Sequence, residues 1–164
     1  MNRKNRYNLI LLALLLTACK PESHKEQLLR QEQAIENYIN RMISQGAIDS
    51  SRVMYNDGVY RLMLIEGTGE GASSGDSVIF HYWASVFNSN QYYDSTGQHP
   101  ERAILGLGHY INGLEKGLSG MKINEYAEIL LTGEQAYGNI NMGILPPYTP
   151  VKFEILMLNV VKNN

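Results

Sequence analysis

The stretch Asn112-Gly-Leu-Glu-Lys-Gly-Leu-Ser-Gly120 decides the fold class, because it carries the signals of a short helix between segments with the pattern of strands. Asn112 belongs to the residue types that cap helix N-termini, and Glu115 stands three residues later, as in a capping box. Gly120 stands where a glycine commonly ends a helix. We therefore expect one short helix over residues 112–120.

Short apolar runs that suit strands lie on both sides of this helix. Asn56-Asp-Gly58 predicts a tight hairpin turn, since Asp-Gly readily adopts the positive φ angles that such turns need. The predicted strands cover residues 53–55, 59–65, 77–87, 126–132 and 151–161, and a further strand begins at Tyr92. This order of elements predicts an α+β fold, a mostly antiparallel sheet with one short helix against it.

A longer helical pattern precedes the strands, over residues 25–45, and Gly46 stands where it would end. Its apolar residues recur at three- and four-residue spacings: Leu28, Ile35, Tyr38, Ile39, Met42 and Ile43. An amphipathic helix must bury its apolar stripe against something. The pattern over residues 25–46 is compatible with three partners: the rest of the same chain, a second copy in a homodimer, or a client polypeptide.

The first residues predict an export signal. Three basic residues, Arg3, Lys4 and Arg6, precede an aliphatic run over residues 9–16 that is too short to span a bilayer. Leu16-Thr-Ala-Cys19 is similar to the lipobox of bacterial lipoproteins. That resemblance implies removal of residues 1–18, lipidation of Cys19, a tether over residues 19–24 and a place at the outer membrane, facing the periplasm. The alternative is an ordinary secretory signal followed by an unused cysteine.

Charge and cysteine content narrow the possible partners. Without residues 1–18 the chain has 11 basic residues (14 minus three) and 16 acidic ones, a formal charge of −5. This acidic balance argues against nucleic acid as a partner. Cys19 is the single cysteine of the sequence, so intramolecular disulfides are excluded.

Motifs for the common polar chemistries are missing from the sequence. Gly106-Leu-Gly108 followed by Gly113 lacks the third glycine of a dinucleotide fingerprint and the Lys-Ser/Thr of a P-loop. The four histidines show no paired spacing typical of metal ligands, and there is no Gly-x-Ser-x-Gly elbow. We therefore expect neither a metal site nor a cofactor.

The stretch Glu134-Gln-Ala-Tyr-Gly-Asn-Ile-Asn-Met-Gly-Ile-Leu-Pro-Pro147, called the flap below, is unusually apolar for a loop. It is part of an ordered series of motifs: Val78-Ile-Phe-His-Tyr82, Tyr93-Asp-Ser95, Leu105-Gly106, Tyr110-Ile-Asn-Gly113-Leu-Glu-Lys-Gly117, Ala136-Tyr-Gly138, Gly143-Ile-Leu-Pro-Pro147 and Val151-Lys-Phe153. In order and spacing this series resembles the FK506-binding-protein family of peptidyl-prolyl isomerases, over about residues 67–161. The resemblance implies an antiparallel sheet curled around one short helix, with an isomerase domain over residues 50–164.

The resemblance also implies a pocket for the substrate's proline. Its residues would be Asp94 and Tyr137 as catalytic groups and Tyr82, Tyr93, Tyr110, Ile111, Leu114, Ile144 and Phe153 as substrate-binding groups. Hydrogen bonds would come from Asp94, the Tyr137 hydroxyl and the backbone of residues 110 and 111. For each residue the alternative is a structural place in the core, above all for Tyr82 and Phe153.

This chain departs from the family pattern on one wall of that pocket. Leu114 replaces the usual tryptophan at the helix start, and Glu101 and Ala103 replace two aromatic residues. The leading hypothesis is a lipid-anchored isomerase that acts on proline-containing unfolded or partly folded exported polypeptides. The second is a catalytically weak chaperone or client-binding module of the same fold, and the third a purely structural envelope lipoprotein.

Overall fold

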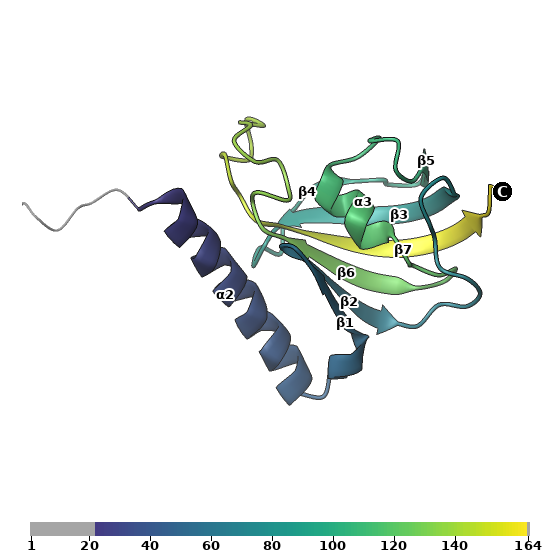
Figure 1. The fold of residues 1–164 in the computed structure, drawn as a ribbon, viewed down its shortest axis with the longest axis horizontal. Helices are drawn as coiled ribbons and strands as arrows, with labels where there is room; N and C mark the ends of the chain where they lie inside the picture. Colours follow the sequence, from purple (N-terminus) through teal and green to yellow (C-terminus); the bar gives the residue numbers. More distant parts are fainter. Residues whose placement is uncertain (1–21, 164) are drawn as a thin grey trace, which may run out of the picture.

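The structure is a computed structural model that describes residues 22–163 (Figure 1). The elements are α2 (His24–Ser44), a 3-10 turn (Ser50–Arg52), β1 (Val53–Asn56), β2 (Val59–Ile65), β3 (Ser77–Val86), β4 (Tyr92–Ser95), β5 (Glu101–Ile104), α3 (Asn112–Leu118), β6 (Tyr126–Leu131) and β7 (Val151–Val161). The predicted signal peptide and Cys19 lie outside the described residues. No helix within residues 22–163 is long and apolar enough to cross a membrane.

All seven strands join one antiparallel sheet, which confirms the predicted fold class. Their order is β1-β2-β6-β7-β3-β4, and β5 also pairs with β3. β3 and β7 form the longest ladder, from Ser77 opposite Val161 to Val86 opposite Val151. The predicted hairpin turn is confirmed, with Asp57 and Gly58 at φ angles of 48° and 75°. The four-residue strand β5 was not predicted.

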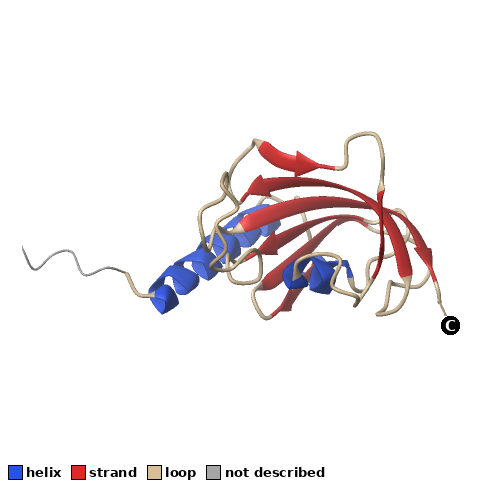
Figure 2. Ribbon diagram, turned by 90° about the horizontal axis from the view of Figure 1, so that it is seen from above, coloured by secondary structure: helices blue, strands red, loops and turns tan. Residues whose placement is uncertain are grey.

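α3 packs against one face of this curved sheet (Figures 1 and 2). Its close approach depends on glycines: a Cβ on Gly117 would come within 2.6 Å of the Ile129 side chain. The predicted capping by Asn112 is wrong, since Ile111 is the N-cap residue and no side chain caps the helix. The Glu115 carboxylate instead accepts hydrogen bonds from the loop N–H groups of Gly106 and Tyr110, 3.1 and 3.3 Å away.

α2 covers the opposite face. Neighbouring residues of β2 show this, because Val59 belongs to the buried cluster under α3 whereas Tyr60 packs with Ile35 and Ile39 of α2. Ser23 and Glu26 form a capping box at the start of α2, and Gly46 follows its end at φ 69°. Of the three partners compatible with the sequence, the apolar stripe of α2 therefore has the sheet of its own chain.

Charged and hydroxyl groups extend the packing on the α2 face. The Tyr38 hydroxyl donates to Glu128 at 2.8 Å, and the Lys152 ammonium lies 3.4 Å from Glu128 and 2.9 Å from Glu154. The Tyr126 hydroxyl donates to Glu154 at 2.9 Å. One helix residue, Tyr38, thus joins a network that otherwise belongs to the sheet.

A buried cation closes the far end of α3. Arg61 of β2 donates from Nη1 to the carbonyls of Gly117 and Ser119, 3.1 and 2.6 Å away, and its Nε lies 3.6 Å from Glu125. Burial lowers the pKa of Arg61, partly offset by the charge of Glu125. Positive charge at a helix C-terminus is stabilising, so Arg61 fixes the end of α3 that lies farthest from the predicted pocket.

Candidate functional site

An aromatic cluster lies at the end of the sheet where α3 begins. Phe80 and Tyr82 come from β3, Phe153 from β7, and Tyr110 from the loop that enters α3. The rings of Tyr82 and Phe153 are 5.9 Å apart, and those of Phe80 and Tyr110 are 5.6 Å apart, both edge to face. Edge-to-face contacts at these separations are favourable, so the rings hold one another in place. Phe80 and Phe153 are buried, and the accessible part of the cluster is the half-buried Tyr82 and Tyr110.

Two carboxylates fix the hydroxyl ends of this cluster. The Tyr82 hydroxyl donates to Asp94 at 2.7 Å, and the Tyr110 hydroxyl donates to Glu101 at 3.0 Å. Burial, followed by the hydrogen bonds to these carboxylates, raises the pKa of Tyr82 and of Tyr110. Both hydroxyls are therefore protonated at neutral pH and keep their rings in fixed orientations.

Tyr93 presents a buried hydroxyl that has no hydrogen-bond partner within residues 22–163. Burial, and next the neighbouring Tyr137 hydroxyl, raises the pKa of Tyr93, although the two oxygens do not meet hydrogen-bond geometry. Both rings pack against the core beneath the cluster. Buried donors are nearly always paired in native proteins, so the Tyr93 hydroxyl stands out as an unpaired polar group directly beside Tyr137.

The start of α3 supplies the aliphatic part of the site. Leu114 is 2% exposed and belongs to the core beneath the cluster, whereas Ile111 is half-buried beside Tyr110. Leu114 thus presents almost no surface. Ile111 carries most of the accessible aliphatic surface here.

The flap connects β6 to β7, and its adjacent aliphatic residues Ile144 and Leu145 differ in burial. Ile144 is 70% exposed, whereas Leu145 is 3% exposed and packs into the core. The structure therefore brings Tyr82, Tyr93, Tyr110, Ile111, Leu114, Tyr137 and Phe153 together on one core, with Asp94 bonded to Tyr82, but it does not bring Ile144 to them. The sequence contained no signal that distinguishes these adjacent aliphatic residues.

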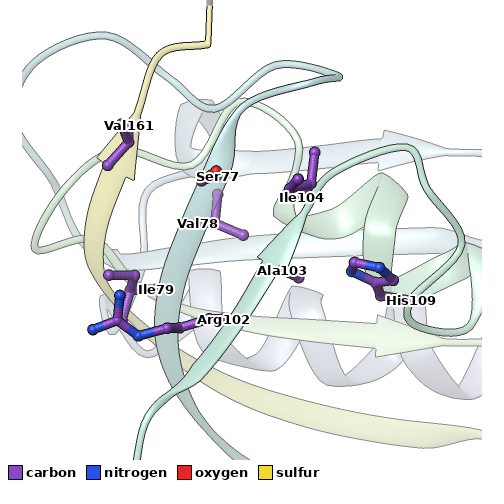
Figure 3. Close-up of a pocket in the computed structure, with 8 residues that line it drawn as sticks. All are labelled: Ser77, Val78, Ile79, Arg102, Ala103, Ile104, His109 and Val161. Atoms are coloured by element: carbon purple, nitrogen blue, oxygen red, sulfur yellow. The ribbon is translucent and has the colours of Figure 1, made fainter.

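A separate hollow of about 380 Å³ lies along β5, between β3, the end of β7 and the loop before α3 (Figure 3). Arg102 and Ile79 are register partners and extend to the same side, whereas His109 lies on the other side of β5. None of the predicted site residues lines this hollow. Within residues 22–163 no three His, Cys, Asp or Glu side chains are grouped so as to hold a metal ion.

Known proteins share both the fold and the sequence pattern of this chain. A crystal structure of a peptidyl-prolyl cis-trans isomerase from Pseudomonas syringae pv. tomato superposes with a TM-score of 0.64 at 21% identity, covering 88% of this chain and 100% of that one. At this identity the likeness shows the shared fold alone.

Sequence relatives carry names of the same class. FK506-binding protein 2A of Rhizopus delemar is 35% identical over 98 residues, which are 58% of this chain and 59% of that protein. Peptidyl-prolyl cis-trans isomerase FKBP10 of Bos taurus is 32% identical over 88 residues, 52% of this chain and 15% of that protein. The chain thus spans well under two thirds of the length of these curated relatives.

The family comparison covers most of the sheet. The family model described as FKBP-type peptidyl-prolyl cis-trans isomerase matches residues 69–158, from the connection after β2 into β7, and so includes every residue of the aromatic cluster. α2 lies outside the matched residues. The chain belongs to the FKBP-type peptidyl-prolyl cis-trans isomerase family.

Proposed function

We propose that the protein accelerates cis-trans isomerisation of X-Pro bonds in unfolded or partly folded exported polypeptides. The observation that carries the proposal is the aromatic cluster, with Tyr82 fixed by Asp94 and the unpaired Tyr93 hydroxyl beside Tyr137. The half-buried Tyr82 and Tyr110 offer apolar contact for a proline ring, and the Tyr137 hydroxyl is the proposed donor to the carbonyl before it.

The chemistry fits such a surface because no covalent bond is broken. Amide resonance sets a barrier of about 18–20 kcal/mol to rotation about the peptide bond. A thousandfold acceleration needs only about 4 kcal/mol of preferential binding to the twisted amide. Apolar surroundings disfavour the polar planar amide, and fixed donors hold the rotated carbonyl. In this proposal Tyr137 donates to that carbonyl, and Asp94 acts by orienting Tyr82.

The proposed cellular context rests on the sequence before Glu22. Cys19 in its lipobox-like setting favours a lipid anchor in the cell envelope, at the outer membrane facing the periplasm. Mass spectrometry of the mature protein, purified from the membranes of cells that express the whole sequence, tests this directly. An acylated N-terminus at Cys19, lost in Cys19→Ser, is the expected result, and an unmodified Cys19 contradicts it.

A second candidate function is binding of client polypeptides without efficient catalysis. The flap favours it, because Ile140, Met142 and Ile144 are 58%, 49% and 70% exposed. The exposed side chains form an apolar surface that suits unfolded segments. Glu101, which replaces an aromatic residue, further reduces the apolar wall available for catalysis.

One assay separates the two candidates. A short X-Pro peptide is first brought to a cis fraction above its equilibrium value. The chain from residue 22 onward is then added, as wild type, Asp94→Ala or Tyr137→Phe, and the rate at which the cis fraction returns to equilibrium is measured. Tyr137→Phe removes the proposed hydrogen bond to the rotated carbonyl, and Asp94→Ala removes the bond that orients Tyr82, so we expect about a tenfold lower kcat/KM for each variant. Glu36→Gln, on the exposed side of α2, is the control. No acceleration by the wild type rejects the isomerase, and retained suppression of client aggregation then supports the binding function.

A further inference from the structure

The two ends of the flap meet at its base. Gly133 follows β6 and Tyr148 precedes β7, and a Cβ on Gly133 would clash with the Tyr148 carbonyl. The backbone joins this base to the middle of the flap: Gly138 N donates to the Gly133 carbonyl at 2.8 Å, and Tyr148 N donates to the Gly138 carbonyl at 2.6 Å. Gly138 is the direct neighbour of Tyr137, so the base determines where the Tyr137 backbone lies.

A side chain of α2 bonds both ends of this base. The Gln31 Nε2 donates to the Tyr148 carbonyl at 2.8 Å, and the Gly133 N–H donates to Gln31 Oε1 at 2.8 Å. Because one partner is an acceptor and the other a donor, the carboxamide fits in one orientation and uses both its ends. Figures 1 and 2 show the first turns of α2 at this end of the sheet.

Further contacts of α2 surround the same base. The His24 ring lies 4.3 Å from the Tyr148 ring, and its Nε2 lies 3.9 Å from Glu134. Tyr148 has a φ of 56°, an unfavourable conformation for a residue with a large side chain. Such a conformation persists only where its surroundings hold it, and α2 supplies part of those surroundings.

We infer that Gln31 is a positioning residue of the isomerase site, acting on Tyr137 through the base of the flap. This inference rests on the proposed function. α2 lies outside the family match at residues 69–158, so the sequence pattern shared by the family does not account for this contact. The long N-terminal helix is then part of the working site as well as a cover for the sheet.

The test substitutes Gln31 without changing its size. Gln31→Met removes both hydrogen bonds, Gln31→Glu keeps the acceptor for Gly133 and loses the donor to Tyr148, and Gln33→Met on the exposed side of α2 is the control. For Gln31→Met we expect kcat on an X-Pro peptide to fall by about fivefold to tenfold, with faster amide hydrogen exchange at Gly133 and Gly138. Gln31→Glu places a carboxylate oxygen against the Tyr148 carbonyl and should lower kcat at least as much as Gln31→Met, whereas Gln33→Met should match the wild type.

A double-mutant cycle with Tyr137→Phe distinguishes positioning from general destabilisation. If Gln31 acts through Tyr137, Gln31→Met lowers kcat by less than twofold when Tyr137 is already phenylalanine. An equal loss of kcat in the wild-type and Tyr137→Phe backgrounds, or an unchanged kcat despite faster amide exchange at Gly133 and Gly138, would overturn this inference and leave the proposed function standing. An inactive wild type would reject the proposed function and this inference with it. The thermal midpoint of each variant shows that it is folded at the assay temperature.

Discussion

The two faces of the sheet are both covered by a helix, but the helices differ in length and in what they bury. On the α3 face a seven-residue helix packs on a cluster of 19 buried apolar residues, which continues into the aromatic cluster of the site. On the α2 face a 21-residue helix packs on a smaller cluster of seven such residues and adds the Glu128, Lys152 and Glu154 network. The short helix thus completes the family domain, and the long helix covers the other face with a mixture of apolar and charged contacts.

This difference predicts that shortening a buried side chain destabilises the protein most on the α3 face. Phe80→Ala removes a fully buried ring from the α3 face and takes away the neighbour of both Tyr82 and Tyr110. We expect the free energy of unfolding to fall by about 4 kcal/mol, with loss of isomerase activity in the remaining folded protein. Urea unfolding followed by circular dichroism measures the change. A loss below about 1 kcal/mol would mean that the two faces do not differ as described.

The corresponding change on the other face is Ile35→Ala. Ile35 is fully buried between α2 and the sheet, so the expected loss is about 3 kcal/mol. The cluster on this face is smaller, and we therefore expect α2 of the variant to separate before the sheet unfolds. Urea unfolding followed by hydrogen exchange of α2 and β7 amides tests this. Coincident transitions in the variant would show that the two faces unfold as one unit.

The charged network offers a smaller effect. Tyr38→Phe removes the hydroxyl that donates to Glu128, which is 7% exposed, and leaves that carboxylate short of a partner. We expect the free energy of unfolding to fall by about 1–2 kcal/mol. Tyr55→Phe is the matched control, because its ring is 60% exposed and its change should fall within about 0.5 kcal/mol of zero. Equal changes in the free energy of unfolding for the two substitutions would show that the Tyr38 hydrogen bond does not stabilise the fold.

Tyrosines on both faces should make the free energy of unfolding fall at alkaline pH. Burial, followed by carboxylate hydrogen bonds, raises the pKa of Tyr38 and Tyr126 on the α2 face and of Tyr82 and Tyr110 at the site. The unfolded chain loses these protons first, at about pH 10, so their contribution to stability is complete below that pH and declines above it. The urea midpoint should be level from pH 8 to 9.5 and fall at pH 11. A urea midpoint that stays unchanged between pH 9.5 and pH 11 would contradict this.

Elements with strong local signals could be predicted from the sequence. The periodicity and Gly46 place the N-terminal helix within one residue of the observed His24–Ser44, and Asp57-Gly58 determines the first hairpin. β5 could not be predicted, because two of its four residues, Glu101 and Arg102, are charged and its pairing with β3 supplies its order. The Asn112 cap failed since the chain enters α3 one residue earlier and Glu115 bonds the loop instead.

The site was predictable in composition more than in detail. The motifs identified the aromatic residues that the structure brings together, since their order along the chain follows the strands. They did not distinguish Ile144 from Leu145, because the backbone turn of the flap decides which side chain points inward. Gln31 had no signal at all: its role depends on two backbone groups more than 100 residues away in sequence, brought beside it by the tertiary fold.

α2 begins next to the flap, so an attachment at the N-terminal end of the chain and one at its C-terminal end would orient the flap differently. The C-terminus lies at the opposite end of the sheet (Figure 1), so a tag or support there leaves the flap free. Four residues lie between Cys19 and His24, so the Cα atoms of these two residues are at most about 18 Å apart. If Cys19 carries the proposed lipid, the start of α2 is held within about that distance of the bilayer surface, together with the flap base beside it, and the proposed clients would be received at the membrane side of the molecule.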